Sequence, residues 1–135
     1  MAQPQRSQFG HLRPDAALLG WLFPGIGHWL IGDAARGAIL AVTIASLWAA
    51  GLLIGGLGVI DSHENPWWYG AQAMIAPSIA VEYVSRRWDV QPSHGRVNEQ
   101  GVLYTALAGL LNLLATVDVL YRGPEQADAA RHNVE

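Results

Sequence analysis

The chain has 135 residues, a formal net charge of -3 at pH 7, 51% hydrophobic residues and 14% charged residues. This length fits one domain, and the apolar content favours the membrane class of proteins over the soluble class. The basic residues are all arginine and the net charge is negative, so we expect no nucleic-acid partner. The absence of cysteine excludes disulfides, thiolate metal sites and thiol catalysis.

Four apolar segments, separated by short polar stretches, occupy residues 16–31, 38–60, 66–85 and 102–121. They predict an all-α fold, an integral membrane helical bundle that crosses the lipid bilayer several times. The predicted membrane domain covers residues 15–122, between a polar N-terminal tail at 1–14 and a polar C-terminal tail at 123–135. A helix needs about 20 apolar residues to cross a membrane, so the last three segments are the secure spans.

The first segment is short and is interrupted by Pro24 and Gly25. Asp15 is suited to cap a helix that begins at Ala16, and the Pro-Gly pair predicts that this helix breaks. We therefore expect a broken or re-entrant element on the cytoplasmic side. A tilted full span stays open as an alternative, and a cleaved signal peptide is a minor one.

The remaining segments carry clear start and stop signals. Segment 38–60 has no formal charge, and segment 66–85 opens with Pro66 followed by Trp67-Trp68-Tyr69, whose rings suit headgroup depth. Pro77 predicts a kink within that third span. Arg122-Gly123-Pro124 is expected to stop the fourth helix.

The arginines suggest a topology. A re-entrant first segment puts six arginines on one side and two on the other, which obeys the positive-inside rule; the six are Arg6, Arg13, Arg36, Arg86, Arg87 and Arg96, and the two are Arg122 and Arg131. Four full spans would divide them four and four. Both arrangements place the 32–37 turn and the 85–101 loop on the same side, in what we expect to be a bacterial inner membrane.

His28 lies within an apolar run, where a polar ring requires a partner or water. Asp33 and Arg36 are its nearest companions in the sequence. We expect His28 to bind a carbonyl that the Pro-Gly break exposes, which would be a structural role. Proton transfer or ligand binding is the alternative.

Two carboxylates within the apolar segments each stand four residues before an arginine: Glu82 before Arg86 and Asp118 before Arg122. Residues four apart are neighbours on a helix, so each acid can pair with its arginine. We expect the two pairs to anchor opposite ends of the bundle, with a proton relay as the alternative.

Small residues form stripes that allow helices to approach closely. One stripe lies in the second segment at Ala41, Ala45 and Ala49, where Gly51 and Gly55 add a GxxxG spacing. The other lies in the fourth segment at Thr105, Gly109, Asn112 and Thr116. We expect these faces to pack against each other or against another subunit, with Asn112 bonding across the contact. A solute pathway along the second stripe is the alternative.

No complete reaction signature occurs in the chain. The five histidines show no metal-ligand spacing, and neither a nucleophile elbow nor a phosphate-binding loop is found. We therefore predict no metal, no cofactor and no enzymatic activity.

The stretch from Pro24 to Gly32, followed by Arg36-Gly37, resembles the helical hairpin of small bacterial membrane proteins of the TM-two type. The likeness covers residues 16–60. The chain is similar more closely to multi-pass bacterial proteins of unknown function, which share a Leu-Asn-Leu-Leu like that at 111–114 and a late acid like Asp118. The resemblance implies a membrane location and transfers no catalytic residue.

These observations predict a non-enzymatic accessory, scaffold or assembly subunit that packs against partner transmembrane helices or against itself. The alternative is a small transporter or channel component with a polar path near His28, Glu82 and Asn112.

Overall fold

The computed structural model describes the backbone of residues 12–91 and 94–132, and the side chains of residues 12–91 and 94–122. Within these ranges every regular element is helical, which confirms the predicted all-α class. The elements are α1 (Pro14–Leu22), α2 (Ile26–Leu30), α3 (Ala34–Gly55), the 3-10 turn η2 (Leu57–Val59), α4 (Pro66–Gln72), α5 (Ala76–Arg87) and α6 (Arg96–His132).

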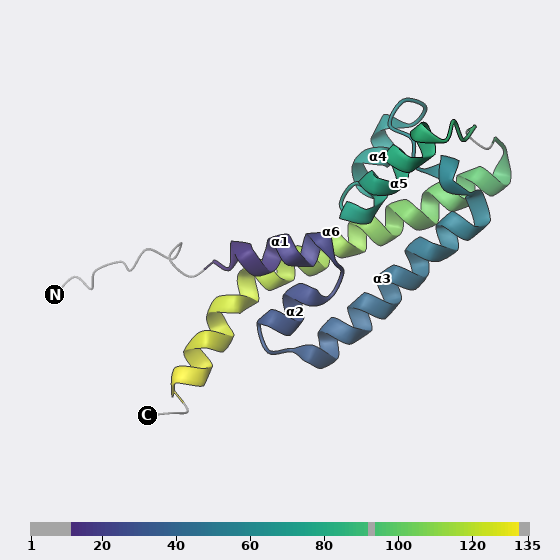
Figure 1. Ribbon diagram of the computed structural model, residues 1–135. Helices are drawn as coiled ribbons and strands as arrows, with labels where there is room; N and C mark the ends of the chain where they lie inside the picture. Colours follow the sequence, from purple (N-terminus) through teal and green to yellow (C-terminus); the bar gives the residue numbers. More distant parts are fainter. Residues whose placement is uncertain (1–11, 92–93, 133–135) are drawn as a thin grey trace.

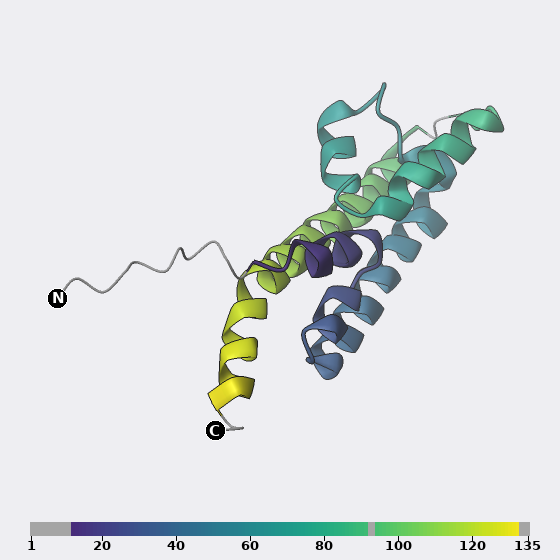
Figure 2. The same cartoon turned by 60° about the vertical axis from the view of Figure 1, so that its left-hand side comes forward.

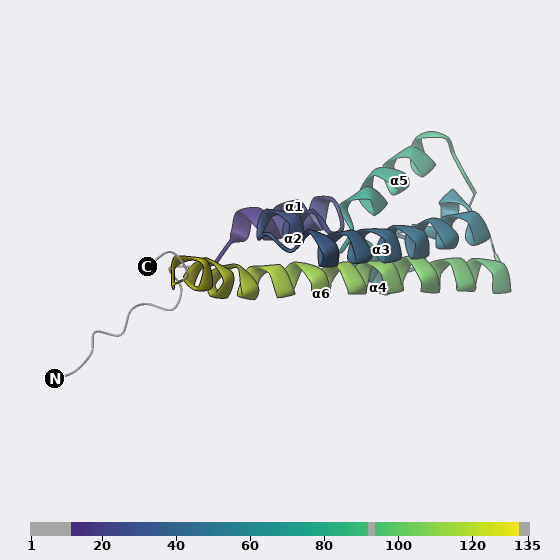
Figure 3. The same cartoon turned by 90° about the horizontal axis from the view of Figure 1, so that it is seen from below.

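The long helices α3 and α6 lie side by side and antiparallel, and they form the central contact of the molecule (Figures 1 and 3). The described chain has two helices that are long and apolar enough to cross a membrane: Ala34–Gly55 and the Arg96–Arg122 part of α6. They correspond to the second and fourth predicted segments. The Asp33 side chain accepts a hydrogen bond from the Arg36 amide, so α3 begins before the predicted residue 38.

The first segment is broken as predicted. Helix α1 ends with Phe23 in an extended conformation, and Gly25 has φ 86°, which a residue with a side chain rarely adopts. A Cβ atom at Gly25 would also collide with the Gly37 carbonyl oxygen, so the break lies directly against α3. The predicted cap at Asp15 is wrong: α1 begins at Pro14, because a proline in the first turn needs no amide partner.

The third segment is not the single kinked span that the sequence predicts. It forms two short helices, α4 and α5, separated at residues 73–75, where Ile75 is extended. Pro77 lies in the first turn of α5, where its missing N–H is tolerated, so the proline starts a new helix. Neither part is among the helices long enough to span.

Both broken segments therefore form hairpins that begin and end at one end of the α3–α6 pair (Figure 2). His28 of the first hairpin contacts Asp118 near one end, and Glu82 of the second contacts Ser62 at the other end. The second hairpin returns the chain to the end it left, so the 32–37 turn and the 85–101 loop lie at opposite ends. The predicted common side for these loops is wrong.

Because these two loops lie at opposite ends, the arginines no longer indicate an orientation in the membrane. The described arginines divide equally between the ends, with Arg13, Arg36 and Arg122 at one and Arg86, Arg87 and Arg96 at the other. The six-to-two bias required the two loops to share a side.

Helix α6 is longer than predicted at both ends. It starts at Arg96, directly after Gly95 with φ 107°, and its backbone stays helical to His132. The predicted stop at Arg122-Gly123-Pro124 is wrong, because a single proline removes one backbone donor while the alanine-rich sequence after it favours a helix. Figure 1 shows α6 changing direction toward its C-terminal end.

Glycine permits the closest approach between α3 and α6. A Cβ atom at Gly51 would lie 2.6 Å from Thr105 Cγ2 and 2.9 Å from the Gly101 carbonyl oxygen. Gly55 also faces Gly101, which confirms the predicted packing role of the Gly51–Gly55 pair. Ala45 and Ala49 are exposed, so they lie outside this contact.

Candidate functional site

The tips of the two hairpins meet at Asn112, near the middle of α6. The Asn112 amide nitrogen donates to the Met74 carbonyl at 2.9 Å and to the Trp21 carbonyl at 3.3 Å. Trp21 in turn donates its indole N–H to the Ala73 carbonyl at 3.1 Å. Because both breaks expose backbone carbonyls, a buried amide donor is the partner they require. The predicted cross-contact bond of Asn112 is therefore found, but to the hairpin tips and not to α3.

A second buried polar contact lies about two helical turns away along α6, at Thr105. Gln72 at the end of α4 donates to Thr105 Oγ1 at 2.7 Å and to the Val59 carbonyl at 3.2 Å. Trp48 of α3 donates to Ser78 of α5 at 3.0 Å. Gly109 lies against the Ala71 carbonyl, so this glycine permits close packing of α6 against α4 and not against α3. These bonds fasten the second hairpin to both long helices.

Asp118 is the centre of a charged junction at the other end of α6. It accepts a bond from Arg122 Nε at 2.7 Å, as predicted, and it lies 3.0 Å from His28 Nε2. The His28 ring is 1% exposed, and an ionised Asp118 requires the His28 proton on Nε2. The predicted carbonyl partner of His28 is wrong; the ring crosses to a residue 90 positions later in the chain.

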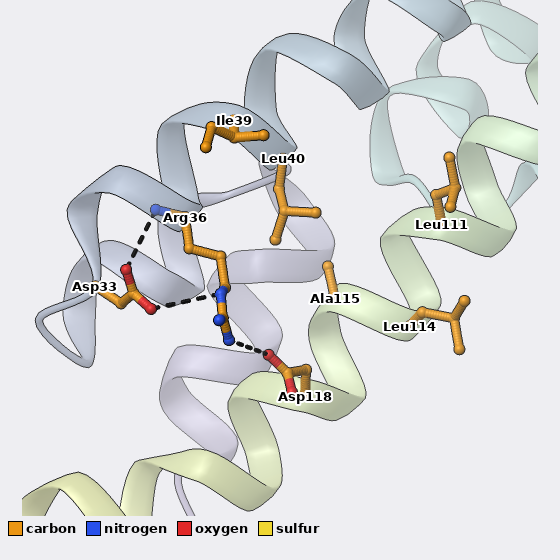
Figure 4. Close-up of a pocket in the computed structure, with 8 residues that line it drawn as sticks. All are labelled: Asp33, Arg36, Ile39, Leu40, Leu111, Leu114, Ala115 and Asp118. Carbon is orange, nitrogen blue, oxygen red and sulfur yellow. Dashed lines mark hydrogen bonds and ion pairs between the residues drawn. The ribbon is translucent and has the colours of Figure 1, made fainter.

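Arg36 and Asp33 complete this junction from the start of α3. The Arg36 guanidinium lies 3.5 Å from Asp33 and 3.7 Å from Asp118 (Figure 4). Asp33 and Arg36, the nearest companions of His28 in the sequence, therefore contact each other, and no direct contact of either with the His28 ring is found among the described residues. Their link to His28 runs through Asp118, which the sequence gives no reason to place there.

A groove opens between α3 and α6 beside this junction, with a volume of about 600 Å³. Its walls are apolar and its polar groups gather at one end (Figure 4). The lining residues are Asp33, Arg36, Ile39, Leu40, Leu111, Leu114, Ala115 and Asp118.

Glu82 forms a separate junction at the opposite end of the molecule. It accepts bonds from Arg86 Nη2 at 2.7 Å and from the Ser62 amide at 3.2 Å. Burial by itself raises the pKa of Glu82, but hydrogen bonds from Ser62 and Tyr69 and the Arg86 guanidinium outweigh it and lower the pKa to about 2. The predicted Glu82–Arg86 pair is confirmed, and its position opposite the Asp118–Arg122 pair is as expected.

The described residues contain no group of three His, Asp or Glu side chains that could hold a metal ion. At one end of the molecule Asp118 is paired with Arg122 and His28, and at the other end Glu82 is paired with Arg86. The side-chain amide of Asn112, between them, is bonded to backbone carbonyls. This arrangement is suited to holding helices together.

Residues 15–133 match the family of unknown function DUF6677. The chain belongs to this family. The match covers every described helix apart from Pro14, the first residue of α1, so the DUF6677 region and the helical domain coincide. Neither the curated proteins nor the solved structures give a match to the chain.

Sequence reasoning missed several residues that the structure places at the hairpin contacts, namely Trp21, Trp48, Gln72 and Ser78. Gln72 and Ser78 carried a signal, since each is a polar residue inside a segment that was expected to lie in lipid. The tryptophans carried none, because a tryptophan at mid-depth and one at an interface look alike in a sequence.

Proposed function

We propose that this DUF6677 protein is a non-enzymatic integral membrane subunit that packs helix α3 against a transmembrane helix of a partner. The observation that carries the proposal is the exposure of α3. Only 17% of its apolar window is buried within the protein, against 44% for α6. In water so large an apolar surface would be unfavourable, whereas lipid and partner helices accommodate it.

The exposed side of α3 contains a face suited to a partner helix. Ala38, Ala45 and Ala49 recur at helical spacing on this side and all are exposed. Small residues on a lipid-facing surface permit close backbone approach, which is the main source of helix association in membranes. Ala45 and Ala49 belong to the predicted small-residue stripe. The small residues of α3 therefore divide into an internal part, Gly51 and Gly55, which faces α6, and this exposed part.

A transporter or channel component is the second candidate. It is favoured by the two broken helices that enter from opposite ends and meet at Asn112, since discontinuous helices surround the substrate in many transporters. Against it, His28, Glu82 and Asn112 lie at one end, the other end and the middle, and each is bonded to protein groups.

The test is gentle purification of the tagged protein from its native membrane, followed by measurement of particle mass and composition. We expect a stoichiometric complex with a larger membrane protein, which Ala45→Leu and Ala49→Leu disrupt because their side chains hold the helices apart. Thr43→Leu is the control, because Thr43 is exposed on a different side of α3.

A particle that contains one chain, or copies of this chain alone, would contradict the partner proposal. Flux assays in liposomes would then decide the transporter alternative: Glu82→Gln and His28→Ala should reduce flux if these groups line a path.

A further inference from the structure

The groove between α3 and α6 has its polar groups at the depth where lipid headgroups would lie. Asp33 directly precedes α3, and Arg36 lies in the first turn of that helix. Asp118 stands one turn inside Arg122, the last residue of the apolar part of α6. If α3 and α6 cross the bilayer, the charged end of the groove is level with the headgroups.

The rest of the groove runs inward along apolar side chains. It continues from Asp118 to Leu111 on α6, a distance of about 10 Å at the helical rise per residue. Leu40 and Ala115 point toward each other across it (Figure 4). An acyl chain fits such a surface, because it fills apolar space and needs no hydrogen bond.

The Arg36 guanidinium, which lines the groove, has donors to spare. The Arg86 guanidinium bonds Glu82 and Ser62, and Arg122 bonds Asp118 at 2.7 Å. Among the described residues the Arg36 guanidinium has only carboxylate neighbours at 3.5 and 3.7 Å and is 42% exposed. A guanidinium in this state is suited to bind a phosphate through two parallel N–H bonds.

The two carboxylates beside Arg36 determine the class of headgroup. Asp33 and Asp118 would repel a headgroup that carries only negative charge, whereas they attract an ammonium group. A headgroup with a phosphate and a primary amine satisfies both charges. The amine also supplies N–H donors, which a quaternary choline lacks.

We propose that this groove binds one phosphatidylethanolamine molecule, with its phosphate on Arg36, its ammonium group beside the Asp33 and Asp118 carboxylates that flank this arginine, and one acyl chain along Leu40 and Ala115. This inference rests on the membrane location in the proposed function. It makes the lipid a specific ligand that fills the space between the two spanning helices.

The test is native mass spectrometry of the detergent-purified full chain, titrated separately with phosphatidylethanolamine, phosphatidylglycerol and phosphatidylcholine. We expect one phosphatidylethanolamine per chain, bound about tenfold more tightly than the other two lipids, which corresponds to about 1.4 kcal/mol. Arg36→Gln should weaken this binding about tenfold, and Arg87→Gln, an exposed arginine at the opposite end, should leave it unchanged.

A second variant tests the groove without changing its charges. Leu114 is 66% exposed at the groove wall, so Leu114→Trp should cover the groove and reduce binding, while Leu107→Trp, two helical turns away on the same side, should not.

Equal binding of the three lipids, or equal binding by Arg36→Gln and Arg87→Gln, would overturn the lipid site. A chain that fractionates with the membrane yet binds no lipid overturns this inference alone; one that fractionates as a soluble protein overturns the proposed function too.

Discussion

Single charged residues hold together parts of this chain that lie far apart in the sequence. Asp118 accepts from Arg122 on its own helix and lies 3.0 Å from His28 of the first hairpin. Glu82 does the same for the second hairpin, since it joins α5 to the loop at Ser62. Glu82 is buried and Asp118 is partly exposed, and a carboxylate removed from water in this way is stabilised by ion pairs and hydrogen bonds, so each acid holds the elements around it together.

The Glu82 junction predicts a pH dependence of stability. The lowered pKa of about 2 means that Glu82 stabilises the fold fully above its unfolded pKa, and that this contribution is lost as the pH falls from about 4.5 toward 2. Glu82→Gln should reduce the free energy of unfolding at pH 7 by about 1–3 kcal/mol and should remove this part of the pH dependence.

Tryptophan fluorescence during denaturation of the detergent-solubilised protein, between pH 3 and pH 7, measures both effects. Glu64→Gln is the control, because Glu64 is an exposed carboxylate in the adjoining turn. Equal stability of the two variants across this range would show that the Glu82 contacts do not contribute.

At the scale of the elements, prolines determine where the apolar segments divide. Pro24 lies in the break between α1 and α2, and Pro77 lies in the first turn of α5. Both have the same physical cause, a missing backbone donor, but the outcome depends on whether other groups satisfy the freed carbonyls. Asn112 donates to the Trp21 and Met74 carbonyls at the two hairpin tips, and the Trp21 indole donates to the Ala73 carbonyl, four residues before Pro77.

The contact between α3 and α6 predicts opposite effects for two glycine substitutions. Gly51→Ala should destabilise the protein by about 1–3 kcal/mol, because its methyl group would meet Thr105 and the Gly101 backbone. Gly70→Ala should be neutral or stabilising by up to about 1 kcal/mol, because nothing lies within 4 Å and alanine favours the helix. Thermal denaturation of the two variants in the same detergent compares them directly, and a destabilisation shared by both would contradict the close α3–α6 contact.

At the scale of the whole molecule, two long antiparallel helices carry two hairpins that enter from opposite ends (Figures 1 and 2). The irregular backbone at each hairpin tip lies against other protein groups, which is the condition under which lipid tolerates it. The outer side of α3 is left uncovered, and that surface is the basis of the proposed partner contact.

This architecture predicts which loops are reached from the same side of the membrane. The sequence contains no cysteine, so single cysteines can be introduced without background. Glu64→Cys and Arg87→Cys should react with an impermeant maleimide from one side of intact cells or inverted vesicles, and Ala34→Cys from the other, because the second hairpin returns to the end it left. Labelling of Ala34→Cys and Arg87→Cys from the same side would show that segment 66–85 crosses the membrane, as the sequence predicts, and would contradict the hairpin.

The sequence by itself determined the helical class, the two long apolar helices, the break at Pro24 and the two acid–arginine pairs. These features depend on composition and on contacts within four residues, which a linear pattern records. Only the tertiary structure decided that segment 66–85 turns back, that His28 reaches Asp118 and that Asn112 joins the hairpin tips. Those outcomes depend on which distant group satisfies a buried donor or acceptor, and hydrophobicity along the chain does not contain that information.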